Sequence, residues 1–322
     1  MMSAPLRVLL ITQGVSRVVK PLMESRHEIV GLMESAPRGY QLIKKESIAL
    51  TIIKQCHSTL FGKKETLKSF ASEKKIPYRF MISSDDLGLE SWIRSLEVDI
   101  IVVFSMSQLL KENIFSIPKF GTINLHPSFL PEYRGPNPDF WQYYDMELNP
   151  GVTVHFIDKG EDTGDIICQE RVPVPLGIKS PERLDKLIGH TGVRLILQAL
   201  NTISSGELIP KIQGTNSPTE RARNLLSDEH AGIIDWENWP IERIWNLLRG
   251  TELWLNALPQ PKKLYFGQRW SVLEFERFIG QVQPYGTIYR RNGQYCVAAK
   301  DGCIFLSLTI DFKKIVLKMF GK

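Results

Sequence analysis

The segment VDIIVVFS, residues 98–105, limits the possible folds of this chain more than any other feature. Its apolar residues do not alternate with polar ones, which is typical of a strand that is buried on both faces of a sheet. The segments RVLLIT (7–12) and HEIVGLME (27–34) are interpreted as further strands of the same kind. Amphipathic segments with helical spacing stand between the strands, and this alternation predicts a largely parallel sheet with helices on both faces.

More elements extend this pattern along the first half of the chain. IPYRFM (76–81) and FGTINLH (120–126) are expected to be strands. Three segments are expected to be helices, and they are VSRVVKPLMES (15–25), KETLKSFASEKK (64–75) and LGLESWIRSLE (87–97). Ligands of such sheets bind at the carboxyl ends of strands. The loops after Ser105 and His126 are therefore candidate parts of a site.

The composition changes near residue 204, and this change divides the chain. SSGELIPKIQGTNSPTERARN (204–224) is rich in Gly, Pro, Ser and polar residues, as connecting segments are. A helix, PIERIWNLLRG, and several short apolar runs with turn signals follow, which is typical of a small barrel or sandwich. We therefore predict an α/β domain in residues 1–204, a linker in 205–225 and a smaller, mainly β domain in 226–322.

Composition and charge exclude several classes of protein. The 322 residues include 40 basic and 35 acidic side chains, and the net charge of +5 is small for a dedicated nucleic-acid-binding protein. The four cysteines show no CxxC spacing, which argues against a zinc site or a disulfide framework. The N-terminal segment lacks the features of a signal peptide, and no apolar run reaches transmembrane length. We expect a cytoplasmic protein without membrane contact.

Two cofactor classes also find no support in the sequence. The first predicted strand is followed by TQGVSR, which has one glycine where dinucleotide-binding folds have GxGxxG. Four histidines show no paired spacing that would suggest metal ligands, and they are His27, His57, His190 and His230. A dinucleotide dehydrogenase and a metal enzyme are therefore disfavoured.

The strongest candidate site lies in INLHPSFLPEYRGPNPDFW, residues 123–141. Asn124 and His126 are two residues apart at the end of a predicted strand, so their side chains share one face while Leu125 faces the core. An amide and an imidazole N–H that point to one place can hold an oxyanion. Taken alone, Asn-x-His fits equally well a histidine that is hydrogen-bonded to the backbone.

A carboxylate follows in NPGVTVHFIDKGEDTGDIICQERVPV. Two strand-like runs, 152–157 and 166–174, are joined there by an acidic turn that contains two glycines. Asp162 lies in this turn, thirty-six residues after His126. A carboxylate next to an imidazole would orient the ring and raise its basicity.

These segments resemble the folate-dependent formyltransferases, a family that includes glycinamide ribonucleotide transformylase, methionyl-tRNA formyltransferase and the sugar N-formyltransferases. The resemblance covers most of the chain and is clearest in DIIVVFSMSQLL, NLHPSFLPEYRG and GVTVHFIDKGEDTGDI. The elements Asn-x-His, LPxYRG and DxGDI, in this order and spacing, form a specific signature. The resemblance implies a Rossmann-like catalytic domain in residues 1–204 and an OB-like barrel in residues 226–322.

The resemblance also implies roles for individual residues. Asn124, His126 and Asp162 match the family's catalytic trio, in which Asn124 and a protonated His126 would stabilise the oxyanion. The co-substrate would be 10-formyltetrahydrofolate, and no metal is implied. Its binding residues would come from the SQLL segment and from the acidic turn, and they are Ser107, Gln108, Leu109, Leu110, Lys159, Gly160, Glu161 and Gly164. A plain helix start and an ordinary glycine turn are the simpler interpretations, and both are compatible with backbone contacts to a ligand.

Several neighbouring residues have two interpretations. Arg134, beside Gly135, could contact substrate or order its loop, and the sequence favours neither. His155 and Asp158 are interpreted as structural residues of the next strand and turn. Three aromatic residues are interpreted as core, with stacking on a nucleotide as the alternative, and they are Trp141, Tyr143 and Tyr144.

The implied reaction transfers a formyl group to a primary amine, a step of one-carbon metabolism. The tRNA-specific members resemble one another in a loop rich in glycine and lysine, whereas residues 36–64 here resemble an apolar helix with a solvated lysine face. We therefore favour a nucleotide-linked amino sugar as the acceptor, with methionyl-tRNA as the alternative. A formyltetrahydrofolate hydrolase would release formate without an amine, and a non-catalytic binding protein would not need the trio. The sequence leaves a homodimer open.

Overall fold

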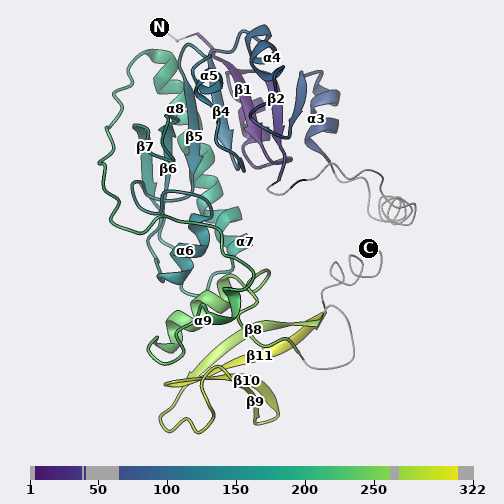
Figure 1. Ribbon diagram of the computed structural model, residues 1–322. Helices are drawn as coiled ribbons and strands as arrows, with labels where there is room; N and C mark the ends of the chain where they lie inside the picture. Colours follow the sequence, from purple (N-terminus) through teal and green to yellow (C-terminus); the bar gives the residue numbers. More distant parts are fainter. Residues whose placement is uncertain (1–3, 38–39, 41–64, 262–267, 311–322) are drawn as a thin grey trace, which may run out of the picture.

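The computed structural model of the chain describes residues 4–37, 40, 65–261 and 268–310. Within these residues the chain forms a seven-stranded sheet and a separate four-stranded sheet, with helix α9 between them (Figure 1). The larger sheet is mostly parallel and the smaller one is antiparallel. This arrangement confirms the predicted class, a Rossmann-like sheet followed by a smaller β unit.

The larger sheet has the strand order β3-β2-β1-β4-β5-β6-β7. Strands β1 to β5 run parallel, whereas β6 pairs antiparallel with β5 and β7 pairs antiparallel with β6. The strands are β1 Arg7–Thr12, β2 Glu28–Ser35, β3 Tyr78–Met81, β4 Ile100–Phe104, β5 Thr122–His126, β6 Gly151–Phe156 and β7 Ile166–Arg171. The strand order reverses between β1 and β4, so the switch point of the sheet lies between these two strands, and β5 is the neighbour of β4.

Each central strand fills the core on both faces of the sheet. In β1, Val8 and Leu10 belong to the core on one face, and Leu9 and Ile11 belong to the core on the other. All four side chains are fully buried. Because successive side chains point to opposite faces, a strand covered on both sides must be apolar throughout. This explains the unbroken apolar run in β4.

Helices cover both faces of the larger sheet. The face that carries Val8 is covered by α1 (Val19–Met23), α3 (Leu67–Lys74) and α8 (Gly189–Ser205). The opposite face is covered by α4 (Leu89–Ser95) and α5 (Glu112–Phe115). In the described ranges, no helix is long and apolar enough to cross a membrane.

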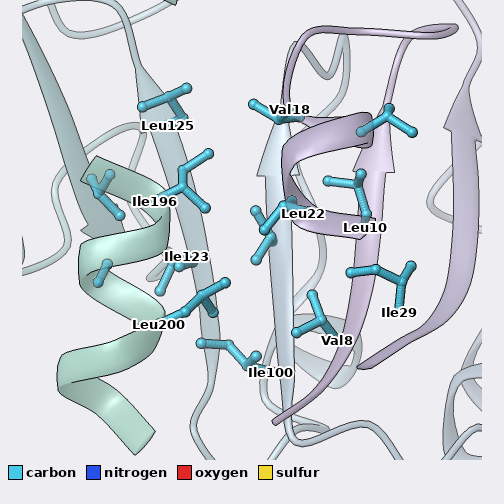
Figure 2. Packing of buried hydrophobic residues seen from close by; sticks show 14 of the residues in the cluster. Val8, Leu10, Val18, Leu22, Ile29, Ile100, Ile123, Leu125, Ile196 and Leu200 are labelled. Atoms are coloured by element: carbon cyan, nitrogen blue, oxygen red, sulfur yellow. The ribbon is translucent and has the colours of Figure 1, made fainter. Parts of the chain in front are cut away.

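Helix α8 is not predicted by the sequence patterns above. It continues from α7 (Ser180–Glu182) through a π-helical segment, Arg183–Ile188. Figure 2 shows Ile196 and Leu200 on the side of α8 that faces Ile123 and Leu125 of β5. Gly192 permits close packing there, because a Cβ at this position would lie 2.8 Å from a methyl group of Leu125. Helix α8 therefore supports the strand that carries the candidate site.

The four-stranded sheet has the order β8-β11-β10-β9. Its strands are β8 Gln268–Arg277, β9 Ile288–Arg291, β10 Gln294–Ala299 and β11 Gly302–Ile310. They share a core with α9 (Ile241–Gly250) and with α6 (Pro138–Tyr144). Tyr143 is buried in this core, and Trp141 and Tyr144 pack against it, so the interpretation of these aromatic residues as core is confirmed.

The packing of α8 can be tested by substitution. Leu200 is fully buried, so Leu200→Ala should lower the free energy of unfolding by about 2–5 kcal/mol in urea denaturation. Gln198 is exposed on the same helix, and Gln198→Ala should change it by less than about 0.5 kcal/mol. Equal effects of the two substitutions would contradict the position of α8 on β5.

Candidate active site

Strand β5 places Asn124 and His126 at the carboxyl edge of the larger sheet. Leu125 points to the opposite face, where it is buried beneath α8, as predicted. In the antiparallel ladder between β5 and β6, Asn124 pairs with His155 and His126 pairs with Thr153. Polar side chains therefore gather where β5 ends, one strand away from the switch point of the sheet.

The turn between β6 and β7 carries Asp162. Its φ of 54° lies in the left-handed region, which is uncommon for a residue other than glycine. Asp158 shapes the turn by accepting hydrogen bonds from Gly160 N–H (3.0 Å) and from the Thr163 hydroxyl (2.7 Å). At Gly164 a Cβ would lie 2.0 Å from a carbonyl oxygen of β6, so only glycine fits there. These local constraints aim Asp162 at the end of β5.

The three predicted catalytic residues meet at this edge. His126 Nδ1 lies 3.6 Å from Asp162 Oδ2, and Asn124 Nδ2 lies 3.5 Å from Asp162 Oδ1. Asp162 Oδ2 also accepts a hydrogen bond of 2.9 Å from Gly135 N–H, in the loop after β5. The carboxylate thus stands between the asparagine, the histidine and the backbone of that loop.

The tautomer of His126 follows from its second contact. Its Nε2 lies 3.0 Å from the carbonyl oxygen of Tyr133. A carbonyl oxygen only accepts hydrogen bonds, so Nε2 must carry the hydrogen. In the neutral ring Nδ1 is then unprotonated, and Nδ1 is the atom that faces Asp162. The ring therefore offers a proton acceptor to the site.

Burial and charge set the protonation of the pair. Burial lowers the pKa of His126 below 6.5, although the negative charge of Asp162 acts in the opposite direction. Burial also acts to raise the pKa of Asp162, but the charge of protonated His126 and the contacts with His155 and Gly135 hold it well below its ordinary value. The direction of the His126 shift favours a neutral imidazole beside the carboxylate at neutral pH. The protonated His126 that the family resemblance implies stays a prediction.

His155 is part of the cluster and is not merely a structural residue of β6. Its Nε2 lies 3.2 Å from Asn124 Nδ2 and 3.5 Å from Asp162 Oδ1, and its Nδ1 lies 2.7 Å from the carbonyl oxygen of Phe156. Nδ1–H therefore donates to the carbonyl, and Nε2 accepts from the amide of Asn124. His155 thereby orients that amide. Only the register of β6 against β5 reveals this role, and the sequence patterns do not give that register.

Arg134 orders the loop after β5. Its Nη2 donates to Gln213 Oε1 and to the carbonyl of Gly214, both at 2.8 Å, and its Nη1 donates to the carbonyl of Thr215 at 3.2 Å. These contacts support the loop-ordering interpretation of the two that the sequence allowed. Gly135, the next residue, has a φ of 105°, which favours glycine.

The first predicted folate-binding segment is anchored by side chains. The Ser107 hydroxyl and the Gln108 amide donate to carbonyl oxygens beyond β2 and β3, and Leu110 is buried, whereas Leu109 is 66% exposed. In the described part of the chain, the main chain of residues 107–110 forms no hydrogen bond with other main-chain groups. These groups can therefore bond to a ligand. The segment is not a helix start, since α5 begins later.

The second predicted folate-binding segment, the acidic turn, lies next to the first. Lys159 Nζ is 3.0 Å from the carboxylate of Glu112, which begins α5 directly after the first segment. Glu161 forms an ion pair with Arg221 at 2.5 Å. A Cβ at Gly160 would lie 2.0 Å from the Thr163 hydroxyl, so the turn is compact. Whether these two segments bind folate stays a prediction.

Two predictions about the site concern what the described residues contain. Among them, no group of three or more histidine, cysteine or acidic side chains could hold a metal ion. Nearly all of the insertion at 36–64 lies outside the described residues, and so do its lysines Lys44, Lys45, Lys63 and Lys64. The prediction that these lysines form a solvated helix face therefore stays a prediction.

Comparison with known proteins identifies the family. Residues 36–200 match the family model described as formyl transferase. The methionyl-tRNA formyltransferase of Clostridium beijerinckii is 32% identical over 246 residues, which cover 75% of this chain and 77% of that protein. The corresponding protein of Alkaliphilus metalliredigens is 36% identical over 177 residues, which cover 55% and 54% of the two chains.

Solved structures share the fold at low identity. An N-formyltransferase from Helicobacter canadensis, in complex with folinic acid and dTDP-3-aminofucose, is 15% identical with a TM-score of 0.60, and the match covers 94% of this chain and all of that one. HypX from Aquifex aeolicus in complex with tetrahydrofolic acid is 14% identical with a TM-score of 0.55, over 98% of this chain and 48% of that one. The match to the family model and the extent of the sequence similarity show that the chain belongs to the folate-dependent formyltransferase family.

Proposed function

We propose that this enzyme transfers a formyl group from 10-formyltetrahydrofolate to a primary amine at the carboxyl end of β5, with Asn124, His126 and Asp162 acting on the reacting atoms. One observation carries the proposal: the side chains of Asn124 and His126 both lie within 3.6 Å of the same carboxylate. A proton acceptor, a hydrogen-bond donor and a charge to balance them therefore stand together, as acyl transfer to an amine requires.

The open main chain of Ser107, Gln108, Leu109 and Leu110 would hold the folate ring, and the turn containing Lys159, Gly160, Glu161 and Gly164 would form the second wall. 10-Formyltetrahydrofolate supplies the formyl carbon, and the bond from that carbon to N10 would break when the tetrahedral intermediate collapses. The proton that His126 takes from the attacking amine would then pass to N10 of the departing tetrahydrofolate. The main-chain hydrogen-bonding groups of residues 107–110 and the ion pair that joins the two segments support this assignment. Nothing in it requires a metal.

His126 would take the proton that the attacking amine loses. Its Nε2–H stays bonded to the carbonyl of Tyr133, so the ring keeps its orientation and Nδ1 keeps facing the site. Protonation at Nδ1 creates a positive charge next to Asp162, and the ionised carboxylate stabilises that charge. Asp162 itself is a weak proton acceptor, because its pKa is held low.

Asn124 would donate to the formyl oxygen as negative charge develops there. One amide hydrogen is engaged by His155 at 3.2 Å, whereas the contact with Asp162 at 3.5 Å is at the limit of hydrogen bonding. The second hydrogen is therefore available to the formyl oxygen. A donor of this kind contributes about 3–4 kcal/mol to catalysis.

We propose methionyl-tRNA as the acceptor. The curated relatives carry that name at about one-third identity, and the match to one of them extends over three quarters of both chains. The amino sugar that the sequence patterns favoured rests on residues 36–64, nearly all of which lie outside the described residues. The sugar formyltransferase from Helicobacter canadensis supports the fold alone at 15% identity.

A nucleotide-linked amino sugar is the second candidate, and the charge of the smaller lobe favours it. Four arginines in this part of the chain are each paired with a carboxylate, and they are Arg243, Arg249, Arg277 and Arg291. A guanidinium that is paired in this way has less charge to offer to a polyphosphate backbone. A sugar nucleotide presents only a diphosphate and needs fewer free cations.

The first prediction concerns the catalytic unit. Asp162→Asn and His126→Asn should each lower kcat by about 10²–10⁴. His126 provides the base, and Asp162 provides the negative charge that stabilises the protonated form of His126. The double variant should lose little more than either single variant. Calorimetric folate binding should persist in all three. Near-normal turnover of Asp162→Asn would remove Asp162 from the mechanism.

A second prediction concerns the protonation of His126. Its titration, followed by ¹⁵N NMR of the imidazole, should have a midpoint below 6.5, because burial lowers the pKa. In Asp162→Asn the midpoint should fall further, because the carboxylate charge that raises it is lost. A midpoint above 6.5 in the wild-type protein would contradict the lowered pKa of His126.

The third prediction separates the acceptors. Formyl transfer should occur to methionyl-tRNA. The logarithm of the apparent affinity of the enzyme for this tRNA should fall with the logarithm of the salt concentration, with a slope of about −0.9 per neutralised phosphate on a duplex stem. A dTDP-linked amino sugar, assayed alongside, should give little product. Efficient transfer to the sugar with weak salt dependence would reverse the assignment. Formate release that is equally fast without any amine would instead indicate a hydrolase.

A further inference from the structure

Residues 206–226, called here the connecting segment, join α8 to the smaller lobe, which contains α9 and the four-stranded sheet. On the way they contact both loops of the candidate active site. In Figure 1 this stretch leaves the upper end of α8, descends beside β7 and crosses towards α9. Lys211 exchanges two main-chain hydrogen bonds of 2.8 Å with Ile166, the first residue of β7. This pairing fixes the connecting segment directly next to the turn that carries Asp162.

Gln213 bridges two loops from this position. Its Nε2 donates to the carbonyl oxygens of Asp162 (3.2 Å) and Gly164 (2.5 Å), while its Oε1 accepts from Arg134 Nη2 (2.8 Å). The side chain is only 9% exposed. Both ends of the amide are therefore engaged in a buried setting, where an unpaired polar group would be costly.

The connecting segment also holds the backbone of the loop after β5. Thr219 Oγ1 accepts from Tyr133 N–H at 2.6 Å, and Ala222 N–H donates to the carbonyl of Arg134 at 2.8 Å. The same loop supplies the Tyr133 carbonyl to His126 and the Gly135 N–H to Asp162. Both backbone groups that orient the catalytic pair thus belong to a loop held by this segment.

The conformation of Asp162 gives these contacts a specific task. Its φ of 54° is unfavourable for a residue with a side chain, and such a conformation persists only where surrounding contacts enforce it. Gln213 binds the carbonyl of Asp162 and that of Gly164 two residues later. It therefore fixes the main chain from which the catalytic carboxylate projects.

We propose that Gln213 is a positioning residue for Asp162. Because Gln213 belongs to the connecting segment, this segment is then part of the active site. The inference rests on the proposed role of Asp162. A loss of the two donated hydrogen bonds would let the turn relax and move the carboxylate away from His126 and Asn124. A displacement of about 1 Å at a reacting group can lower a rate by about 10².

The test uses Gln213→Leu, which keeps the volume and removes the amide, and Gln213→Glu, which keeps an acceptor for Arg134 but cannot donate. Both should lower kcat about 10- to 100-fold with little change in KM for folate. Gln281→Leu is the matched control, because the Gln281 amide donates to Gly302 O (3.0 Å) and to a tyrosine hydroxyl in the smaller lobe. Its turnover should stay within about twofold of wild type.

A double variant separates positioning from a general structural effect. In the Asp162→Asn background, Gln213→Leu should cause no further loss, because Gln213 acts through the carboxylate that is already absent. Multiplied losses, or equal turnover of the Gln213 and Gln281 variants, would overturn the inference. If Asp162→Asn were itself fully active, the proposed function would fail instead, so the two failures are distinct.

A readout without turnover completes the test. In Gln213→Leu the NMR titration midpoint of His126 should fall below that of wild type, because the carboxylate that raises it has moved away. In Gln281→Leu it should be unchanged. An unchanged midpoint in Gln213→Leu would overturn the inference, whichever amine the enzyme accepts. If Gln213→Leu does not fold, reduced turnover of Gln213→Glu supports the inference and normal turnover overturns it.

Discussion

The site depends on a buried carboxylate and on the donors that make its burial possible. The side chain of Asp162 is only 15% exposed, and an ionised carboxylate in that position is strongly unfavourable unless hydrogen bonds and positive charge surround it. Gly135 N–H supplies one bond and Asn124 supplies a weak one. The imidazole rings of His126 and His155 stand within 3.6 Å, and each can donate to the carboxylate when it is protonated. The three chain segments that supply these groups must therefore converge on one point. The groups that stabilise the buried carboxylate are therefore the same groups that form the candidate active site.

Strand β5 helps these groups to converge, because one of its faces is packed in the core and the other carries the polar side chains. Leu125 and Ile123 anchor the strand in the core beneath α8, and the close approach at Gly192 leaves little freedom for it to shift. Asn124 and His126 are then held on the other side with the precision of a packed strand rather than of a loop. The antiparallel pairing with β6 brings His155 opposite Asn124 and starts the turn to Asp162. Apolar packing on one face thus positions polar chemistry on the other.

The spacing of apolar residues and the short sequence motifs predicted those parts of this arrangement that depend on neighbouring residues in the sequence. The central strands could be predicted because strands buried on both faces must be apolar throughout, and Asn124 and His126 share a face because strand side chains alternate. The contacts of His155 and Gln213 could not be predicted, since they depend on how segments 31 to 79 residues apart pack together. Helix α8 was missed although its buried residues recur at helical spacing. The direction of the pKa shift of His126 could not be predicted either, because burial, which lowers the pKa, is not visible in a motif.

Two segments of the chain link the catalytic loops to the core of the smaller lobe. Helix α6 follows the loop that contains Tyr133 and Gly135 and packs into the core of the smaller lobe. The connecting segment returns past the turn of Asp162, and its Arg223 carbonyl accepts a hydrogen bond of 2.7 Å from the Trp141 indole of α6. The loop after β5 is therefore fixed at one end by the larger sheet and at the other by α6 in the core of the smaller lobe. The turn of Asp162 has both ends in the larger sheet and is contacted by Gln213 of the connecting segment. The packing of the smaller lobe therefore helps to hold the loop after β5, whose main chain contacts His126 and Asp162.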